Sequence, residues 1–220
     1  MSLTCNCPLG ASIEDIPLGT CAENFGQVQK VLFQRMNTSG VRNKLDASTA
    51  DPKLKATWTA LLASATSTKV VQSPFIQAPA FEPGASRNFG GGNETLDGIE
   101  IVVGREATSF TGVIRSQPQK TIKALKTYEC EESCVALINA QGQIGLLCDD
   151  PDNITEYYLI PISSFFVSDK MVGGLENPDG NNISWKMKPN WSDNFVVVTP
   201  TDFNALTELA TPTPTPTPTA

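Results

Sequence analysis

Short apolar segments separated by turn residues fill the last third of this 220-residue chain. Residues 134–138 and 143–148 flank Gln141-Gly142, a pattern that predicts a β-hairpin. Over residues 183–187, apolar and polar side chains alternate, which is typical of a strand with one wet face. Frequent turns between short strands favour a domain built mainly from β-sheet. Further strands are predicted at 25–35, 99–103, 109–114, 157–162, 165–168 and 195–199.

Two segments have the pattern of a helix instead. Asp51-Pro52 is typical of a helix start, and the apolar spacing that follows predicts a helix over about 52–64. Its apolar face comprises Leu54, Trp58, Leu61 and Leu62. The second helix is predicted to begin at 116–118. Its apolar stripe comprises Ile122, Leu125 and Tyr128, and its basic stripe Lys120, Lys123 and Lys126.

Two helices and about eight strands predict an α+β fold that is mainly β. We expect a β-sandwich or barrel flanked by one or two helices. Residues 25–206 form the domain, and residues 1–24 form an extended N-terminal arm. The tail at 207–220 is rich in Thr-Pro repeats that cannot pack a core. Residues 72–98 are rich in Gly and Pro and predict a long loop, either disordered or ordered by a partner.

The chain contains no histidine. This absence excludes Ser-His-Asp and Cys-His catalysis and removes the commonest general base and metal ligand. Serine with lysine, or a pair of carboxylates, is left open, although no such pairing is evident. We therefore expect a protein that is not an enzyme, with no catalytic residue.

Each of three clusters could be a ligand site or could have an ordinary structural role. Gly90-Gly91-Gly92 lacks the Lys-Ser/Thr that follows the glycines of a phosphate loop. The acidic run Asp149-Asp150 and Asp152 lacks the glycine and distal Glu of a known calcium loop. Cys130 and Cys134 bracket two glutamates, but their spacing is not that of a structural zinc site. The structural reading is favoured for each, so no cofactor and no metal is expected.

The six cysteines are Cys5, Cys7, Cys21, Cys130, Cys134 and Cys148. Reduced, packed thiols are the favoured reading, with disulfides or a metal site as alternatives. Among the tryptophans, Trp58 and Trp185 are expected in the core. Trp191 lies in a predicted turn and is expected to be exposed or interfacial, where it would suit a sugar-binding platform or a protein contact.

Charge and hydropathy limit the cellular context. With 23 acidic and 16 basic residues the net charge is −7, which argues against binding of a nucleic-acid backbone. No segment is apolar for long enough to span a membrane, and the first ten residues do not resemble a signal peptide. We expect a protein made and used in a cytoplasm, or carried out only as part of a particle, without membrane insertion.

Several segments resemble virion proteins of phages and prophages of gut Bacteroidetes. They are Cys5 to Cys21 followed by 25–35, Asn88 to Gly98 followed by 100–104, and the stretches 165–169, 173–175, 178–183 and 191–194. These motifs are turns and strands rather than chemistry. Among virion roles, the chain is most similar to the tail-tube family.

The resemblance implies a subunit that self-assembles into stacked rings, hexameric in that family, which form a conduit for DNA. Its partners would be itself and other virion proteins, with DNA only as passing cargo. It would be located in the virion, assembled in the host bacterial cytoplasm. Contacts between subunits would include Cys5 and Cys7 in the arm, Phe89, Gly91 and Asn93 in the long loop, and Trp191.

Two other functions are left open. The chain could be a capsid auxiliary or head-to-tail connector protein, because the Thr-Pro tail departs from the simplest tube pattern. It could also be a carbohydrate- or surface-binding module on a Thr-Pro stalk, which Trp191 and the tail would suit.

Overall fold

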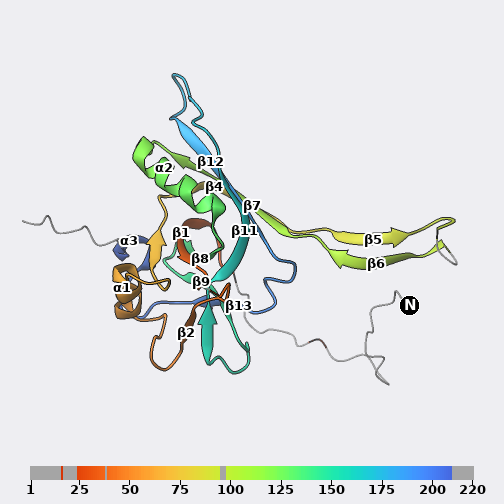
Figure 1. Ribbon diagram of the computed structural model, residues 1–220, viewed down its shortest axis with the longest axis horizontal. Coiled ribbons are helices and arrows are strands. Elements are labelled where there is room, and N and C mark those ends of the chain that lie inside the picture. Colours follow the sequence, from red (N-terminus) through yellow and green to blue (C-terminus); the bar gives the residue numbers. More distant parts are fainter. Residues whose placement is uncertain (1–15, 17–23, 38, 95–97, 210–220) are drawn as a thin grey trace, which may run out of the picture.

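The computed structural model describes residues 16, 24–37, 39–94 and 98–209. Within these residues the fold is α+β and mainly β, as predicted (Figure 1). The strands are β1 (Val28–Arg35), β2 (Lys44–Asp46), β3 (Val70–Gln72), β4 (Gln77–Glu82), β5 (Ser86–Gly90), β6 (Glu100–Arg105), β7 (Thr108–Arg115), β8 (Ser133–Asn139), β9 (Ile144–Cys148), β10 (Glu156–Tyr158), β11 (Ile160–Val167), β12 (Gly180–Met187) and β13 (Phe195–Val198). The helices are α1 (Lys55–Ala63), α2 (Gln119–Lys126), the 3-10 turn η2 (Thr127–Cys130) and α3 (Ala205–Glu208). Most of the predicted N-terminal arm and Thr-Pro tail, including Cys5 and Cys7, lies outside the described residues.

Eleven of the strands form one antiparallel sheet. Its main path runs β2-β10-β9-β8-β11-β12-β7-β4, with β1, β3 and β13 added beside it. The path begins at β2 and ends at β4. Strand β1 pairs with β8, and next to β4 the amides of Ser73 and Ile76 donate to the Val31 and Gln29 carbonyl oxygens of β1, at 2.9 and 2.7 Å. The sheet therefore curls so that β1 also lies beside the β4 end of the path.

The predicted hairpin of β8 and β9 is present, and it opens shortly after its turn. The two strands pair only at Leu137–Gly145 and Ile138–Ile144. Beyond this point β8 pairs with β11, whereas β9 pairs with β10. The sheet therefore divides here and encloses apolar side chains on both faces of β8.

All seven residues of β8 are buried because the strand lies between two cores. Val135 and Leu137 belong to the first core, whereas Cys134, Ala136 and Ile138 belong to the second. This placement explains why the strand reads as a continuous apolar segment and does not alternate.

Aromatic side chains dominate the first core. The rings of Phe110 and Trp185 stack with centroids 3.9 Å apart, and Phe33 lies edge-on to Phe165 at 5.2 Å. Helix α2 covers this core with Ile122 and Leu125, both buried, as its apolar stripe predicts.

The second core lies between the sheet and α1. Trp58 and Leu62 of this helix are buried, and the Trp58 indole donates a hydrogen bond of 2.8 Å to the Pro52 carbonyl oxygen. The helix begins at Lys55, three residues later than predicted, because Asp51 accepts from the Lys53 amide in a preceding turn.

Strand β11 is longer than the sequence predicts. The expected strands at 157–162 and 165–168 are replaced by β10 and by one continuous strand over 160–167. Ser164, with a φ of 52°, lies where the pairing of β11 with β12 shifts register. A bulge of this kind breaks the side-chain pattern while the strand continues.

The predicted loop at 72–98 is the main correction. It contains the strands β4 and β5, which continue one another, and they pair with β7 and β6 respectively. In Figure 1 the β5–β6 pair projects far from the rest of the sheet. We call strands β5 and β6, with the described residues 91–94 and 98–99 between them, the ribbon. None of the helices that the structure describes is long and apolar enough to cross a membrane.

Candidate assembly interface

The ribbon exposes apolar side chains along its length. None of the residues of β5 and β6 is buried, and the exposed fractions of Phe89, Val102 and Val103 are 49%, 55% and 52%. Phe89 lies opposite Ile101 in the register of the two strands. An isolated two-stranded ribbon is only marginally stable in water, and exposed apolar residues that lie together mark interaction sites. The ribbon is therefore the strongest candidate for an interface.

A tight joint connects the ribbon to the sheet at Gly84 and Glu106. A Cβ on Gly84 would lie 2.0 Å from the Glu106 carbonyl oxygen, so only glycine allows the two backbones to approach this closely. The Glu106 amide donates to the Ala85 carbonyl oxygen at 2.9 Å, and the Arg105 guanidinium donates to the Asn190 side chain at 3.1 Å. These contacts hold the base of the ribbon against the sheet.

The tip of the ribbon is a turn built from glycines. Gly90, Gly91 and Gly92 all have positive φ angles, between 56° and 104°, which glycine adopts at little cost. The Glu94 amide donates to the Gly91 carbonyl oxygen at 3.1 Å. The next strand in the described residues is β6. The positive φ angles of the three glycines thus shape the turn between β5 and β6.

Trp191, expected to be exposed or interfacial, lies close to the base of the ribbon and is half-buried. Its ring stacks on Phe81 at 6.3 Å and meets Phe195 edge-on at 5.4 Å. An indole that packs against two other rings has less free surface on which a sugar could stack than an exposed indole has. Of the predicted contact residues, the structure brings together Phe89, Gly91 and Asn93 on the ribbon.

The three cysteines in the described part of the chain are unpaired thiols in different surroundings. Cys130 is exposed, whereas Cys134 and Cys148 are buried. Burial raises the pKa of the Cys134 thiol to about 11, so this thiol stays protonated at neutral pH. Among the described residues, no group of three or more Cys, Asp or Glu side chains is arranged to hold a metal ion.

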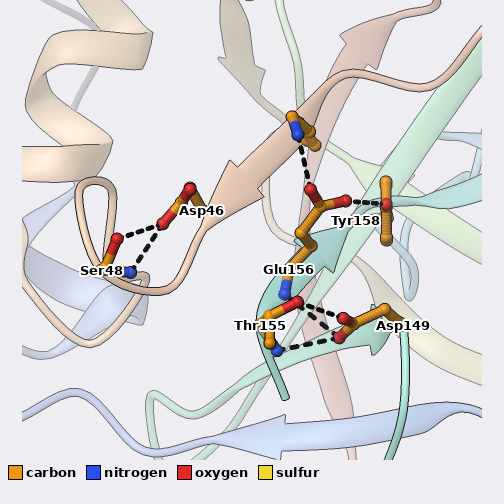
Figure 2. Close-up of polar contacts among 7 residues, drawn as sticks. Asp46, Ser48, Asp149, Thr155, Glu156 and Tyr158 are labelled. Carbon is orange, nitrogen blue, oxygen red and sulfur yellow. Dashed lines mark hydrogen bonds and ion pairs between the residues drawn. The ribbon is translucent and has the colours of Figure 1, made fainter.

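The acidic run after β9 serves the turn that contains it (Figure 2). The Asp149 carboxylate accepts hydrogen bonds from the amides of Thr155 and Glu156, at 3.0 and 3.1 Å, and from the Thr155 hydroxyl. These bonds hold the pKa of the Asp149 carboxyl below its usual range. Asp150 in turn accepts from the Asp152 amide at 3.0 Å.

A second exposed apolar segment lies between β11 and β12, and sequence reasoning did not identify it. The exposed fractions of Val172 and Leu175 are 80% and 107%. Both flank the Gly173-Gly174 turn, so two apolar residues beside a glycine turn were the available signal.

Comparison with known proteins gives a weak likeness among solved structures. No protein-family model matches the sequence, and no curated protein matches it. Among solved structures, a chain described as "Tail of empty GTA particle computed with helical refinement, C6 symmetry" is similar at 10% sequence identity. The alignment covers 76% of this chain and 99% of that chain, with a TM-score of 0.35. A score at this level does not establish a common fold.

Proposed function

We propose that this protein is a structural subunit that assembles with copies of itself into stacked rings, forming a tail tube of a phage-like particle. The ribbon carries this proposal. It places Phe89, Val102 and Val103 in solvent, far from both cores of its own chain. A neighbouring subunit would cover these side chains and stabilise a ribbon that is marginal alone.

The chemistry of the chain supports a role without catalysis. It has no histidine, and its acidic turn and glycine run are used by the fold itself. With a net charge of −7, a lumen formed by such subunits would repel DNA and let it pass. The resemblance of the sequence to tail-tube proteins points the same way. The proposal includes the location of the protein in a virion.

The test is the assembly state of the purified full-length chain. Sedimentation velocity at increasing concentration, followed by negative-stain microscopy, should show rings or tubes. Replacement of the apolar side chains by Phe89→Ser, Val102→Thr and Val103→Thr should leave a folded monomer with an unchanged circular dichroism spectrum. A wild-type chain that stays monomeric at high concentration would contradict the proposal.

A matched control separates the ribbon from exposed apolar residues in general. Val41→Thr, Val172→Thr and Leu175→Ser change three exposed side chains outside the ribbon, which are 57%, 80% and 107% exposed. This variant should assemble at least partly, whereas the ribbon variant should not. Equal loss in both variants would remove the special role of the ribbon.

A connector or capsid protein is the alternative within the same class. A tube subunit contacts mainly its own copies, whereas a connector contacts other virion proteins. Cross-linking within purified particles separates them: links between copies of this chain support a tube, and links chiefly to other proteins support the alternative.

A further inference from the structure

A hollow on the side of the molecule away from the ribbon has the chemistry to receive it. The hollow has a volume of about 620 Å³ and lies beside the end of β1. Its apolar lining includes Phe33, Met36, Val71 and Tyr128. The segment that follows α1 forms its rim through residues 65–69.

The positions of the two features suit a contact between copies. Residues 65–69 follow α1, and Tyr128 follows α2. In Figure 1 both helices lie on one side of the molecule, and the ribbon projects from the other. A ribbon cannot reach the hollow of its own chain in this arrangement. Contact between unlike surfaces of identical copies runs head to tail and gives a ring when it closes.

The charges of the two features are complementary. The two arginines of the ribbon, Arg87 and Arg105, lie where it joins the sheet, and the charged residues described in its outer part are Glu94 and Glu100. The lining of the hollow has two cations, Arg35 and Lys69, and one anion, Glu131. Arg35 forms an ion pair with Glu131, which leaves the exposed Lys69 as the excess positive charge.

The apolar side chains of the ribbon and the hollow are complementary as well. Phe89 is half exposed on the ribbon, and buried aromatic side chains are common anchors of protein interfaces. The lining offers the half-buried Tyr128 for a ring contact and Met36, whose flexible thioether adapts to the shape of a partner.

We infer that this hollow receives the ribbon of a second copy, with Phe89 as the anchor and Lys69 facing the acidic tip. The inference rests on the proposed self-assembly and adds the receptor surface to it. The apolar segment around Leu175 is the competing occupant.

Site-specific photocross-linking tests the inference in the full-length chain. A benzophenone amino acid replaces Phe89, the oligomer is irradiated, and the linked peptide is mapped by mass spectrometry. Links to residues 33–36, 65–71 or 128 of another copy are expected. An oligomer whose links lie elsewhere overturns the receptor assignment but leaves self-assembly intact, whereas the absence of any oligomer contradicts the proposed function itself.

Charge reversal gives an independent measurement. Lys69→Glu should weaken association at least tenfold in sedimentation equilibrium, and adding Glu94→Lys to this variant should restore most of the loss. The control is Lys120→Glu, which reverses an exposed lysine on α2 outside the hollow. Equal weakening by the two single variants, or no recovery in the double variant, would count against the contact.

Discussion

At the scale of single residues, Gly142 connects the β8–β9 turn to the C-terminal end of the domain. Its φ is 81°, and a Cβ there would lie 2.4 Å from the Asn204 side-chain oxygen. That oxygen accepts from the amides of Leu206 and Thr207, at 2.9 and 3.3 Å, and so caps α3. Because Gly142 has no Cβ, the β8–β9 turn can contact Asn204, the residue that caps α3.

Gly142→Ala should therefore destabilise the protein more than strain in the turn alone would. A left-handed φ makes alanine unfavourable by about 1 kcal/mol or more, and displacement of Asn204 adds to this. Gly92→Ala is the control, because its φ is 56° and nothing lies within 4 Å of the added Cβ. Urea unfolding should show a larger loss for Gly142→Ala; equal losses would mean that Asn204 moves away at no cost.

The two fully buried tryptophans should respond differently to substitution by phenylalanine. The indole N–H of Trp58 donates to Pro52, whereas that of Trp185 is buried without a hydrogen-bond partner. Trp58→Phe leaves a carbonyl oxygen without its donor, which costs about 1–3 kcal/mol. Trp185→Phe removes an unsatisfied donor and offsets part of its lost packing. The free energy of unfolding should fall further for Trp58→Phe, and the reverse order would contradict this reading.

At the scale of elements, the turn between β9 and β10 depends on one carboxylate. The pKa of Asp149 is lowered by hydrogen bonds from Thr155 and Glu156. A depressed pKa in the folded state means that the ionised form stabilises the fold above the unfolded pKa, near 3.9. This contribution decreases as pH falls below about 4, where the unfolded state begins to take up a proton, and it is lost once pH passes the lower pKa of the folded state.

Asp149→Ala should thus lower the urea midpoint at pH 7, and the difference from wild type should shrink steadily below pH 4. Asp152→Ala is the matched control, because its carboxylate accepts none of the bonds that hold this turn. Unfolding curves at several pH values measure both variants. A difference that is constant from pH 7 to pH 3 would show that the ionised carboxylate is not the source of the effect.

Elements whose apolar side chains follow a regular spacing or a continuous run were predictable from the sequence. Strand β6 was predicted although none of its residues is buried, whereas the short strands β2 and β3, each with a buried residue, were not. Ile122 and Leu125 repeat at helical spacing because α2 packs on a core, and this spacing predicted the helix. Strand β5 buries nothing, so Phe89 and its neighbours show no alternation and read as a loop. The start of α1 was also beyond prediction, because the Lys55 amide donates to Asp202, a partner 147 residues away.

The candidate interface was predictable in part. The sequence singled out Phe89 and the glycine run, which the structure places on the ribbon, but it did not predict that this segment is a ribbon. Trp191 was expected to be exposed or interfacial because it lies in a turn. Its packing depends on Phe81 and Phe195, which no local pattern brings together. The hollow beside β1 joins residues from three separate segments and left no signal in the sequence.

At the scale of the whole molecule, β8 gives the two cores a shared wall. Val135 and Leu137 face one core and Ala136 and Ile138 face the other, on a strand that is buried throughout. Loss of either core would expose one face of β8, so neither core should persist without the other. The domain should unfold in a single cooperative transition.

Two single-tryptophan variants test this coupling. One keeps Trp58 in the second core and the other keeps Trp185 in the first, with the remaining tryptophans replaced by phenylalanine. Fluorescence and circular dichroism should give coincident urea transitions within each variant. A fluorescence transition that precedes the loss of secondary structure would show that one core melts alone.

The ribbon contributes none of its side chains to either core. Natural selection on mutations in the ribbon should therefore act through its contacts with other molecules and hardly at all through the folding of the domain. A lineage could exchange this segment for another of similar length and alter its choice of neighbours while the sheet stayed the same.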